Sequence, residues 1–92
     1  MIKQKAHAGT LESSDIYVEI APAAAGSGIT LNLTSVVMQQ FGPEIETVIR
    51  QTLSDLGVED AELNVSDRGA VDCTIRARVE TAVCRSREEG GV

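Results

Sequence analysis

The sequence predicts a small α+β domain of two layers, in which a three- or four-stranded sheet is covered on one face by two helices. Three observations predict this fold class. Short segments in which apolar and polar residues alternate, as in half-buried strands, occur at 15–21, 29–34 and 61–65. Two longer segments, 43–56 and 70–85, repeat their apolar residues at helical spacing. The chain has 92 residues, of which 42% are apolar, and this suffices for a single domain with one core.

The first third of the chain is expected to supply most of the strands. Residues 4–9 are a short strand candidate with two alanines on one face. Residues 15–21 place three branched apolar side chains on one face and polar or aromatic ones on the other. The stretch 22–28 is rich in glycine and alanine and predicts a loose loop. We therefore expect the strands on either side of this loop, 15–21 and 29–34, to pair as a hairpin.

The middle helix is predicted to begin near Pro43, because proline fits the first turn of a helix, where its missing N–H costs no hydrogen bond. Residues 35–41 add a candidate preceding turn that would bring Phe41 onto the same apolar face. Gly57 marks the predicted end, since glycine adopts the left-handed conformation that closes many helices.

The segment 70–85 fits two patterns. Its apolar residues alternate at first, as in a strand, and they also follow helical spacing from Ile75 onward. The segment is longer than a usual strand, and its alanines and arginines favour a helix, so we predict a helix. We predict one domain, 1–92, whose polar, glycine-rich tail at 86–92 is disordered.

Charge and composition exclude several classes of function. Eight basic residues against fourteen acidic ones give a net charge of −6, which argues against non-specific binding to nucleic acid. No apolar run approaches the roughly 20 residues that span a bilayer, and the N-terminus lacks the apolar stretch of a secretory signal. Cys73 and Cys84 lie too far apart along the predicted helix for a disulfide, so two free thiols indicate the cytoplasm.

Residues for metal binding or catalysis are sparse. The single histidine, His7, and two distant cysteines give no zinc spacing, so no metal site is predicted. Two adjacent serines, Ser13 and Ser14, stand between acids in "GTLESSD" at 9–15, without the glycine-flanked elbow of a serine nucleophile. His7 is expected to be exposed or capping, not a base for either serine. This stretch is therefore either an ordinary turn or a site that another protein modifies.

A family resemblance runs along nearly the whole chain. The N-terminal signature of the acyl carrier protein, or gamma subunit, of bacterial citrate lyase resembles "AGTLESSD" at 8–15. Four further motifs occur in the same order and at the same spacing as in that family: "IAP" at 20–22, "QQFG" at 39–42, "LNVSDRGAVDC" at 63–73 and "IRARVE" at 75–80. The resemblance implies a carrier subunit, not an enzyme.

The resemblance also implies a covalent prosthetic group. In that family the serine directly after a Leu-Glu pair bears 2'-(5''-phosphoribosyl)-3'-dephospho-CoA through a phosphodiester, and this serine is Ser13 here. Many members have glycine at the next position, where this chain has Ser14, so Ser14 is the second choice. The segment around a modified residue must be exposed and flexible, and Gly9 and the two serines are expected to loosen it.

The implied partners are the subunits of a citrate lyase. They are the alpha subunit (citrate:acetyl-carrier transferase), the beta subunit (citryl-carrier lyase) and a separate prosthetic-group transferase, with no nucleic acid and no membrane. The prosthetic group would carry acetyl and citryl thioesters between transferase and lyase, while citrate is cleaved to acetate and oxaloacetate.

Two other functions stay open. The carrier of malonate decarboxylase uses the same type of arm and shares a "D-x-G-A" turn before its last helix. Threonine-proline usually follows that turn there, whereas Val71 and Asp72 follow it here. The other alternative is a non-carrier assembly or regulatory subunit, in which the two serines are only a turn.

Charged side chains offer candidate contacts with partner subunits. Four arginines of the last predicted helix are candidates for such contacts: Arg76, Arg78, Arg85 and Arg87. Beside the serines, Glu12 and Asp15 are either recognised by the prosthetic-group transferase or merely solvated.

Overall fold

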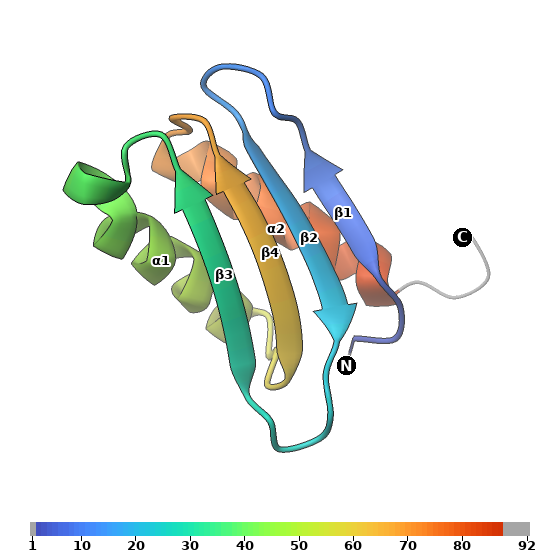
Figure 1. Cartoon of the computed structure of the whole chain (residues 1–92). Coiled ribbons are helices and arrows are strands. Elements are labelled where there is room, and N and C mark those ends of the chain that lie inside the picture. The colour runs from blue at the N-terminus through green and yellow to red at the C-terminus, as the bar shows by residue number, and fades with distance from the viewer. Residues whose placement is uncertain (1, 88–92) are drawn as a thin grey trace.

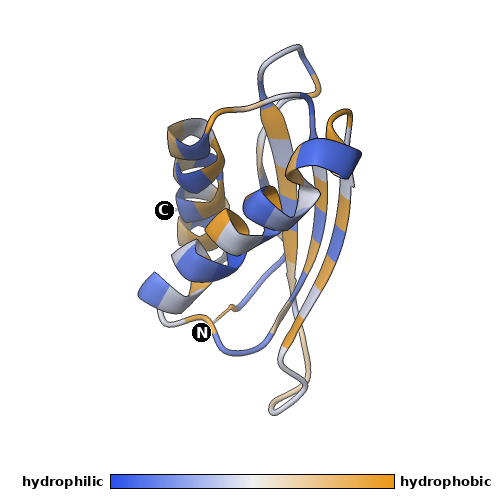
Figure 2. Cartoon of the chain, turned by 90° about the vertical axis from the view of Figure 1, so that its left-hand side faces the viewer, coloured by the Kyte–Doolittle hydropathy of each residue, from blue (hydrophilic) through white to orange (hydrophobic). Residues whose placement is uncertain are grey.

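The computed structural model describes residues 2–87, which form the two predicted layers (Figure 1). The strands are β1 (Ala6–Gly9), β2 (Ile16–Pro22), β3 (Ile29–Ser35) and β4 (Ala61–Asp67). The helices are α1 (Met38–Asp55) and α2 (Asp72–Arg87). Both helices cover the same face of the four-stranded sheet and leave its other face open (Figures 1 and 2). The predicted α+β fold class is confirmed.

The sheet has the strand order β1-β2-β4-β3, so β2 and β3 are not neighbours. β2 runs antiparallel to both β1 and β4, whereas β3 runs parallel to β4. α1 supplies the crossover connection that two parallel strands require. The predicted hairpin of β2 with β3 is therefore wrong. The loop at 23–28 is longer than a tight hairpin turn and passes the start of β4, where the Ala61 N–H donates to the Gly28 carbonyl.

One aliphatic core fills the space between the sheet and the helices. Along β2, Ile16, Val18 and Ile20 are completely buried, as the alternation in the sequence predicted. They pack in one cluster with side chains of β4 and both helices, chiefly Leu63, Val65, Ile45, Ile49, Leu53, Ile75, Val79 and Val83. The open face of the sheet is polar, and there the Asn32 side chain donates to the Asn64 side chain at 3.1 Å. The alternation along the strands thus separates a buried face from an exposed one.

α1 begins earlier than predicted, at Met38, so Pro43 lies inside the helix and not in its first turn. Two backbone N–H groups of the following turn donate to the Val37 carbonyl and start the helix ahead of the proline. Phe41 stands four positions before the buried Ile45, yet it is 46% exposed. The predicted preceding turn is present, and Phe41 shares the apolar face with Ile45, but both line an open groove there, so the ring is only partly covered.

The end of α1 is as predicted. Gly57 has a φ of 73°, in the left-handed region. Its N–H donates to the Ser54 carbonyl at 3.0 Å, and the Val58 N–H donates to the Leu53 carbonyl at 2.9 Å. These two bonds form a Schellman motif, which satisfies carbonyls that a helix end leaves without partners.

α2 confirms the helix over the ambiguous segment and continues to Arg87, two residues into the predicted tail. Ser86 is completely buried, and its hydroxyl donates to the Val83 carbonyl at 2.6 Å. The rest of the tail that was predicted to be disordered, 88–92, lies outside the described residues. Within 2–87, neither helix has the length and apolar composition to cross a membrane.

Replacing both cysteines of α2, Cys73 and Cys84, by alanine is expected to change the free energy of unfolding by less than about 0.5 kcal/mol. Both thiols are free and exposed, so neither side chain contributes much to the core. Urea unfolding followed by circular dichroism measures the difference from wild type. A loss above about 1 kcal/mol would show that at least one of the two side chains packs against the domain.

Candidate functional site

The serine loop, residues 10–15, lies at one end of the sheet beside two other connections (Figure 1). Residues 36–37 lead from β3 to α1, and residues 68–71 lead from β4 to α2. The strand register brings all three together, because Asp67, the last residue of β4, pairs with the first residue of β2 and the last of β3. We call this the serine end of the domain.

Ser13 and Ser14 are both exposed, and neither hydroxyl has a hydrogen-bond partner within residues 2–87. Their backbones differ. The Ser14 N–H donates to the Arg68 carbonyl at 2.8 Å. Ser14 also has a φ of 65°, and in the described part of the chain no other residue except glycines has a positive φ. Ser13 therefore presents its hydroxyl to solvent directly before a residue whose conformation suits glycine.

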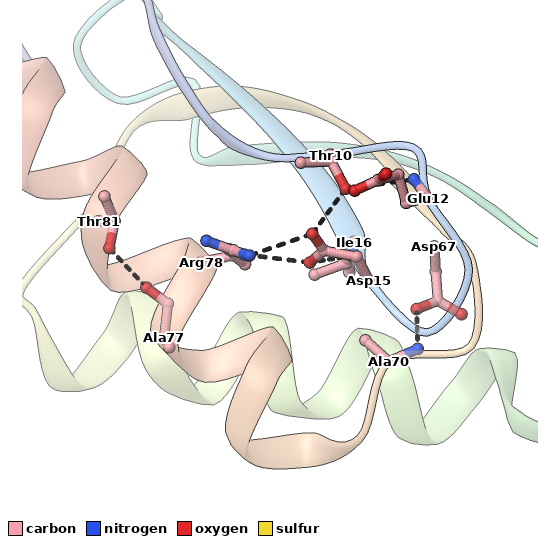
Figure 3. A network of polar contacts seen from close by, with 9 residues as sticks. All are labelled: Thr10, Glu12, Asp15, Ile16, Asp67, Ala70, Ala77, Arg78 and Thr81. Atoms are coloured by element: carbon pink, nitrogen blue, oxygen red, sulfur yellow. Dashed lines mark hydrogen bonds and ion pairs between the residues drawn. The ribbon is translucent and has the colours of Figure 1, made fainter.

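Asp15 fastens the serine loop to α2 (Figure 3). Arg78 donates to both oxygens of this carboxylate, from Nε at 3.0 Å and from Nη2 at 3.1 Å. The Thr10 hydroxyl and the Ile16 N–H donate to the same carboxylate at 2.7 Å each. These bonds, above all those from Arg78 and then those from Thr10 and Ile16, lower the pKa of Asp15 to about 2. One charged carboxylate thus joins both ends of the loop to the last helix.

Arg68 holds the middle of the serine loop from the β4–α2 connection. Its Nε donates to the Leu11 carbonyl at 3.0 Å, and its backbone N–H donates to the Asp15 carbonyl at 2.9 Å. Together with the bond from Ser14 to the Arg68 carbonyl, these contacts order the loop. The serine loop is exposed as expected, but hydrogen bonds fix its backbone where the sequence predicted flexibility.

A buried carboxylate, Asp67, ties the other two connections together. Its Oδ2 accepts from the Ser35 hydroxyl at 2.7 Å and from the Gly69 N–H at 3.1 Å, and its Oδ1 accepts from the Ala70 N–H at 3.0 Å. The Ser35 hydroxyl in turn accepts the Val37 N–H at 3.1 Å. The whole residue is only 1% exposed, so these bonds replace the water that the carboxylate has lost.

The four arginines proposed for docking are all engaged within the chain. Their partners are the Asp55 carboxylate for Arg76, the Asp15 carboxylate for Arg78, the His7 carbonyl for Arg85 and the Leu56 carbonyl for Arg87. Of the two acids beside the serines, Glu12 is exposed, whereas Asp15 is mostly covered by its partners. No local pattern indicates the Asp15–Arg78 pair, because 63 positions separate the two residues.

The arrangement presents a hydroxyl and does not activate it. A serine nucleophile needs a hydrogen-bonded base, and within 2–87 neither serine hydroxyl has one. His7 is exposed on β1, as predicted, with its ring 5.6 Å from that of Tyr17. Among the described residues, no group of three or more histidine, cysteine, aspartate or glutamate side chains is placed to hold a metal ion.

The chain is similar to known proteins over nearly all of its length. A family model described as "ACP: Malonate decarboxylase delta subunit (MdcD)" matches residues 3–86. The citrate lyase acyl carrier protein of Klebsiella pneumoniae is 51% identical over 88 residues, which cover 96% of this chain and 90% of that protein. The protein of the same name from Clostridium perfringens is 49% identical over 87 residues, covering 95% and 85%.

A solved structure shares the fold. It is a chain in the crystal structure of a Pseudomonas malonate decarboxylase hetero-tetramer in complex with malonate. The TM-score is 0.73 at 17% sequence identity, over 90% of this chain and 84% of that chain. At this identity the likeness concerns the arrangement of strands and helices alone.

Gly9→Ala is expected to lower the free energy of unfolding by more than about 2 kcal/mol. A Cβ at Gly9 would lie 1.8 Å from the Ile16 carbonyl oxygen, and the φ of 90° is also unfavourable for alanine. Gly26→Ala is the matched control, because Gly26 has a φ of 84° but no atom within 4 Å of the added Cβ. Urea unfolding of both variants should give the larger loss for Gly9. Equal losses would contradict the close approach of β1 to the start of β2.

Asp15→Asn is expected to destabilise the protein by about 1–2 kcal/mol at pH 7. The loss is smaller than for a fully buried ion pair, because solvent screens the partly exposed Arg78. The folded pKa of Asp15, about 2, lies below the ordinary value of 3.8. The carboxylate therefore contributes its full stability above about pH 4 and loses it as the pH falls through about 2. Urea unfolding from pH 7 down to pH 2.5 should show the difference from wild type shrinking.

Glu12→Gln is the control for this experiment, because Glu12 is an exposed acid of the same loop. Its effect should stay within about 0.5 kcal/mol at every pH. A difference between Asp15→Asn and wild type that did not change with pH would mean that charge is not what Asp15 contributes.

Proposed function

This chain belongs to the citrate lyase acyl carrier protein family, and from that premise we propose that it is the acyl carrier, or gamma, subunit of a citrate lyase. The observation that carries the proposal is 51% identity over 96% of the chain to a protein of that name. Ser13 is exposed on a fixed loop, and within residues 2–87 its hydroxyl has no hydrogen-bonded base, which supports a carrier that does not itself catalyse the reaction. Cytoplasmic location is part of the same proposal.

Ser13 is the proposed attachment site of a phosphoribosyl-dephospho-CoA group. Two observations support Ser13 over Ser14. The position after the modified serine is often glycine in the family, and Ser14 has the positive φ of 65° that suits glycine. The backbone N–H of Ser14 is also bound by the Arg68 carbonyl. The register of the signature and the backbone conformation both support the choice of Ser13.

The residues around Ser13 fit a phosphodiester. The exposed Arg68 places its guanidinium against the Leu11 carbonyl, two positions before Ser13, so a positive charge lies beside the loop. When attached, the group would supply a terminal thiol that carries acyl groups as thioesters. In the described part of the chain, neither serine hydroxyl has a hydrogen-bonded base. The prosthetic-group transferase must therefore activate the Ser13 hydroxyl before the phosphodiester can form.

The contribution of the chain's own residues is positional. Asp15, Arg68 and Arg78 fix the loop on which Ser13 stands, so the attached group starts from a defined point. In the proposed complex, the transferase (alpha) and lyase (beta) subunits would act in turn on the same tethered group. Tethering of this kind gives an effective concentration of about the mM range at each neighbouring site.

The carrier of a malonate decarboxylase is the second candidate function. The family model carries that description, and the solved structure with the shared fold comes from such a complex. The sequence identity favours citrate lyase, at 51% against 17% for the decarboxylase chain. Reconstitution separates the two candidates. The loaded carrier should restore activity either to the remaining subunits of a citrate lyase or to those of a malonate decarboxylase, but not to both.

Ser13→Ala is expected to abolish loading, since without that hydroxyl no phosphodiester can form. The measurement is the intact mass of the carrier after coexpression with the prosthetic-group transferase. Wild type should gain the mass of one phosphoribosyl-dephospho-CoA group, and Ser13→Ala should gain none. Citrate cleavage by the reconstituted complex should be lost in parallel.

Ser14→Gly is the matched control, because glycine fits the φ of 65° at this position and removes only the hydroxyl. This variant should load and support citrate cleavage like wild type. If Ser13→Ala still gained the prosthetic group and Ser14→Gly did not, the attachment site would be Ser14 and not Ser13. Absence of loading in wild type would overturn the proposed carrier function.

A further inference from the structure

Large exposed apolar side chains gather at the serine end. Five are found in the described part of the chain: Leu11, Val36, Met38, Phe41 and Val71. They are between 44% and 63% exposed, and they belong to the serine loop, the two neighbouring connections and the first turn of α1. We call these five residues the serine-end patch. Exposed apolar side chains that gather at one end of a domain, unlike ones scattered singly, mark a candidate interaction surface.

Two hollows lie at the serine end, and residues of the patch line part of each. A groove of about 440 Å³ lies between the start of α1 and the β4–α2 connection, and Phe41 and Val71 both line it. A second hollow, of about 280 Å³, is lined by Leu11 and Val36 and otherwise by polar residues, Arg68 among them. Four of the five patch residues therefore line a hollow, two in each.

The charges around the patch are mainly acidic. Glu44 and Asp72 line the groove together with its apolar residues, and Glu12 is exposed on the serine loop. Of the nearby cations, Arg78 is paired with the Asp15 carboxylate, whereas Arg68 donates to a neutral carbonyl and keeps its charge, so one cation stands against the three acids. A surface with an apolar centre and an acidic rim is complementary to one with an apolar centre and a basic rim.

This charge pattern favours one occupant over the others. A second copy of the chain would bring two acidic rims together, and the phosphates of an arm on Ser13 would be repelled by Glu44 and Asp72. An enzyme that receives such an arm needs basic side chains around its entrance to bind those phosphates. The same basic side chains would pair with the acidic rim when the carrier is seated over that entrance.

We propose that the serine-end patch is the surface by which this carrier docks on the enzyme subunit that exchanges acyl groups on its arm. This inference rests on the proposed function. The partner's matching surface is apolar with basic residues around the entrance to its active site. Because Leu11 of the patch lies on the same loop as Ser13, docking aims the arm at that entrance. The arginines of α2, which are engaged within the chain, are not the main contacts.

Val36→Asp combined with Val71→Asp is the test variant. Both side chains are more than 60% exposed, so neither charge enters the core. The Val71 carbonyl accepts the N–H groups of Thr74 and Ile75 at the start of α2, where aspartate is a favoured capping residue. The variant should therefore fold as well as wild type. The matched control is Ala24→Asp with Ala25→Asp, which adds the same charge at two exposed residues near the opposite end of the sheet.

The measurement is the affinity of each unloaded carrier for the purified acyl-exchanging (alpha) subunit, by titration calorimetry at low and at high salt. The test variant should bind about tenfold or more weakly than wild type, and the control within about threefold. High salt should weaken wild-type binding only modestly, because most of the contact is apolar. Wild-type affinity in the test variant, or equal losses in test and control, would overturn the proposal.

Three further readouts separate this inference from its alternatives and from the proposed function. A wild-type dimer in sedimentation equilibrium that the test variant loses would assign the patch to a second copy. Loss of binding of the apolar dye ANS on loading, without any partner, would assign the patch to the arm. Either result overturns the proposal. Attachment of the prosthetic group to wild-type Ser13, measured by intact mass, does not depend on these results. It tests the carrier function separately.

Discussion

The pairing of β4 with a strand on each side is the constraint on which the arrangement of the serine end depends. β2 is antiparallel to β4, and β3 is parallel to it. The start of β2 and the ends of β3 and β4 therefore meet at one end of the sheet. The connections that follow or precede those strand ends must lie there as well. The exposed serines, the groove beside α1 and the start of α2 are neighbours because of this register and not because of closeness in sequence.

Two carboxylates convert this meeting of connections into a fixed surface. Asp67 is buried and accepts bonds from both the β3 side and the β4–α2 connection. Asp15 joins the serine loop to α2 through Arg78. A carboxylate accepts several hydrogen bonds at once, which suits it to connect segments that are far apart in the sequence. The result is a loop whose backbone is held, while the Ser13 hydroxyl has no hydrogen-bond partner among residues 2–87.

A fixed loop changes how delivery of the proposed arm must work. If the backbone around Ser13 were mobile, the carrier would supply part of the reach between active sites. With the backbone held by Asp15 and Arg68, the reach must come from the arm itself, while the protein supplies a defined origin and a surface around it. Apolar contacts at that surface favour a docked geometry that salt disturbs little, in contrast to contacts made by solvated arginines.

The sequence by itself determined the features that depend on local pattern. Alternation along 16–20 predicted which side chains of β2 are buried, Gly57 marked the end of α1, and the signature around Ser13 indicated the family and the register of the candidate site. Only the tertiary structure decided that β4 separates β2 from β3, that Asp15 pairs with Arg78, and that Phe41 lies open in a groove. Periodicity records which face of a segment is apolar, because burial repeats with the geometry of the strand or helix. It does not record which distant segment lies against that face, because such choices follow from the packing of the whole chain.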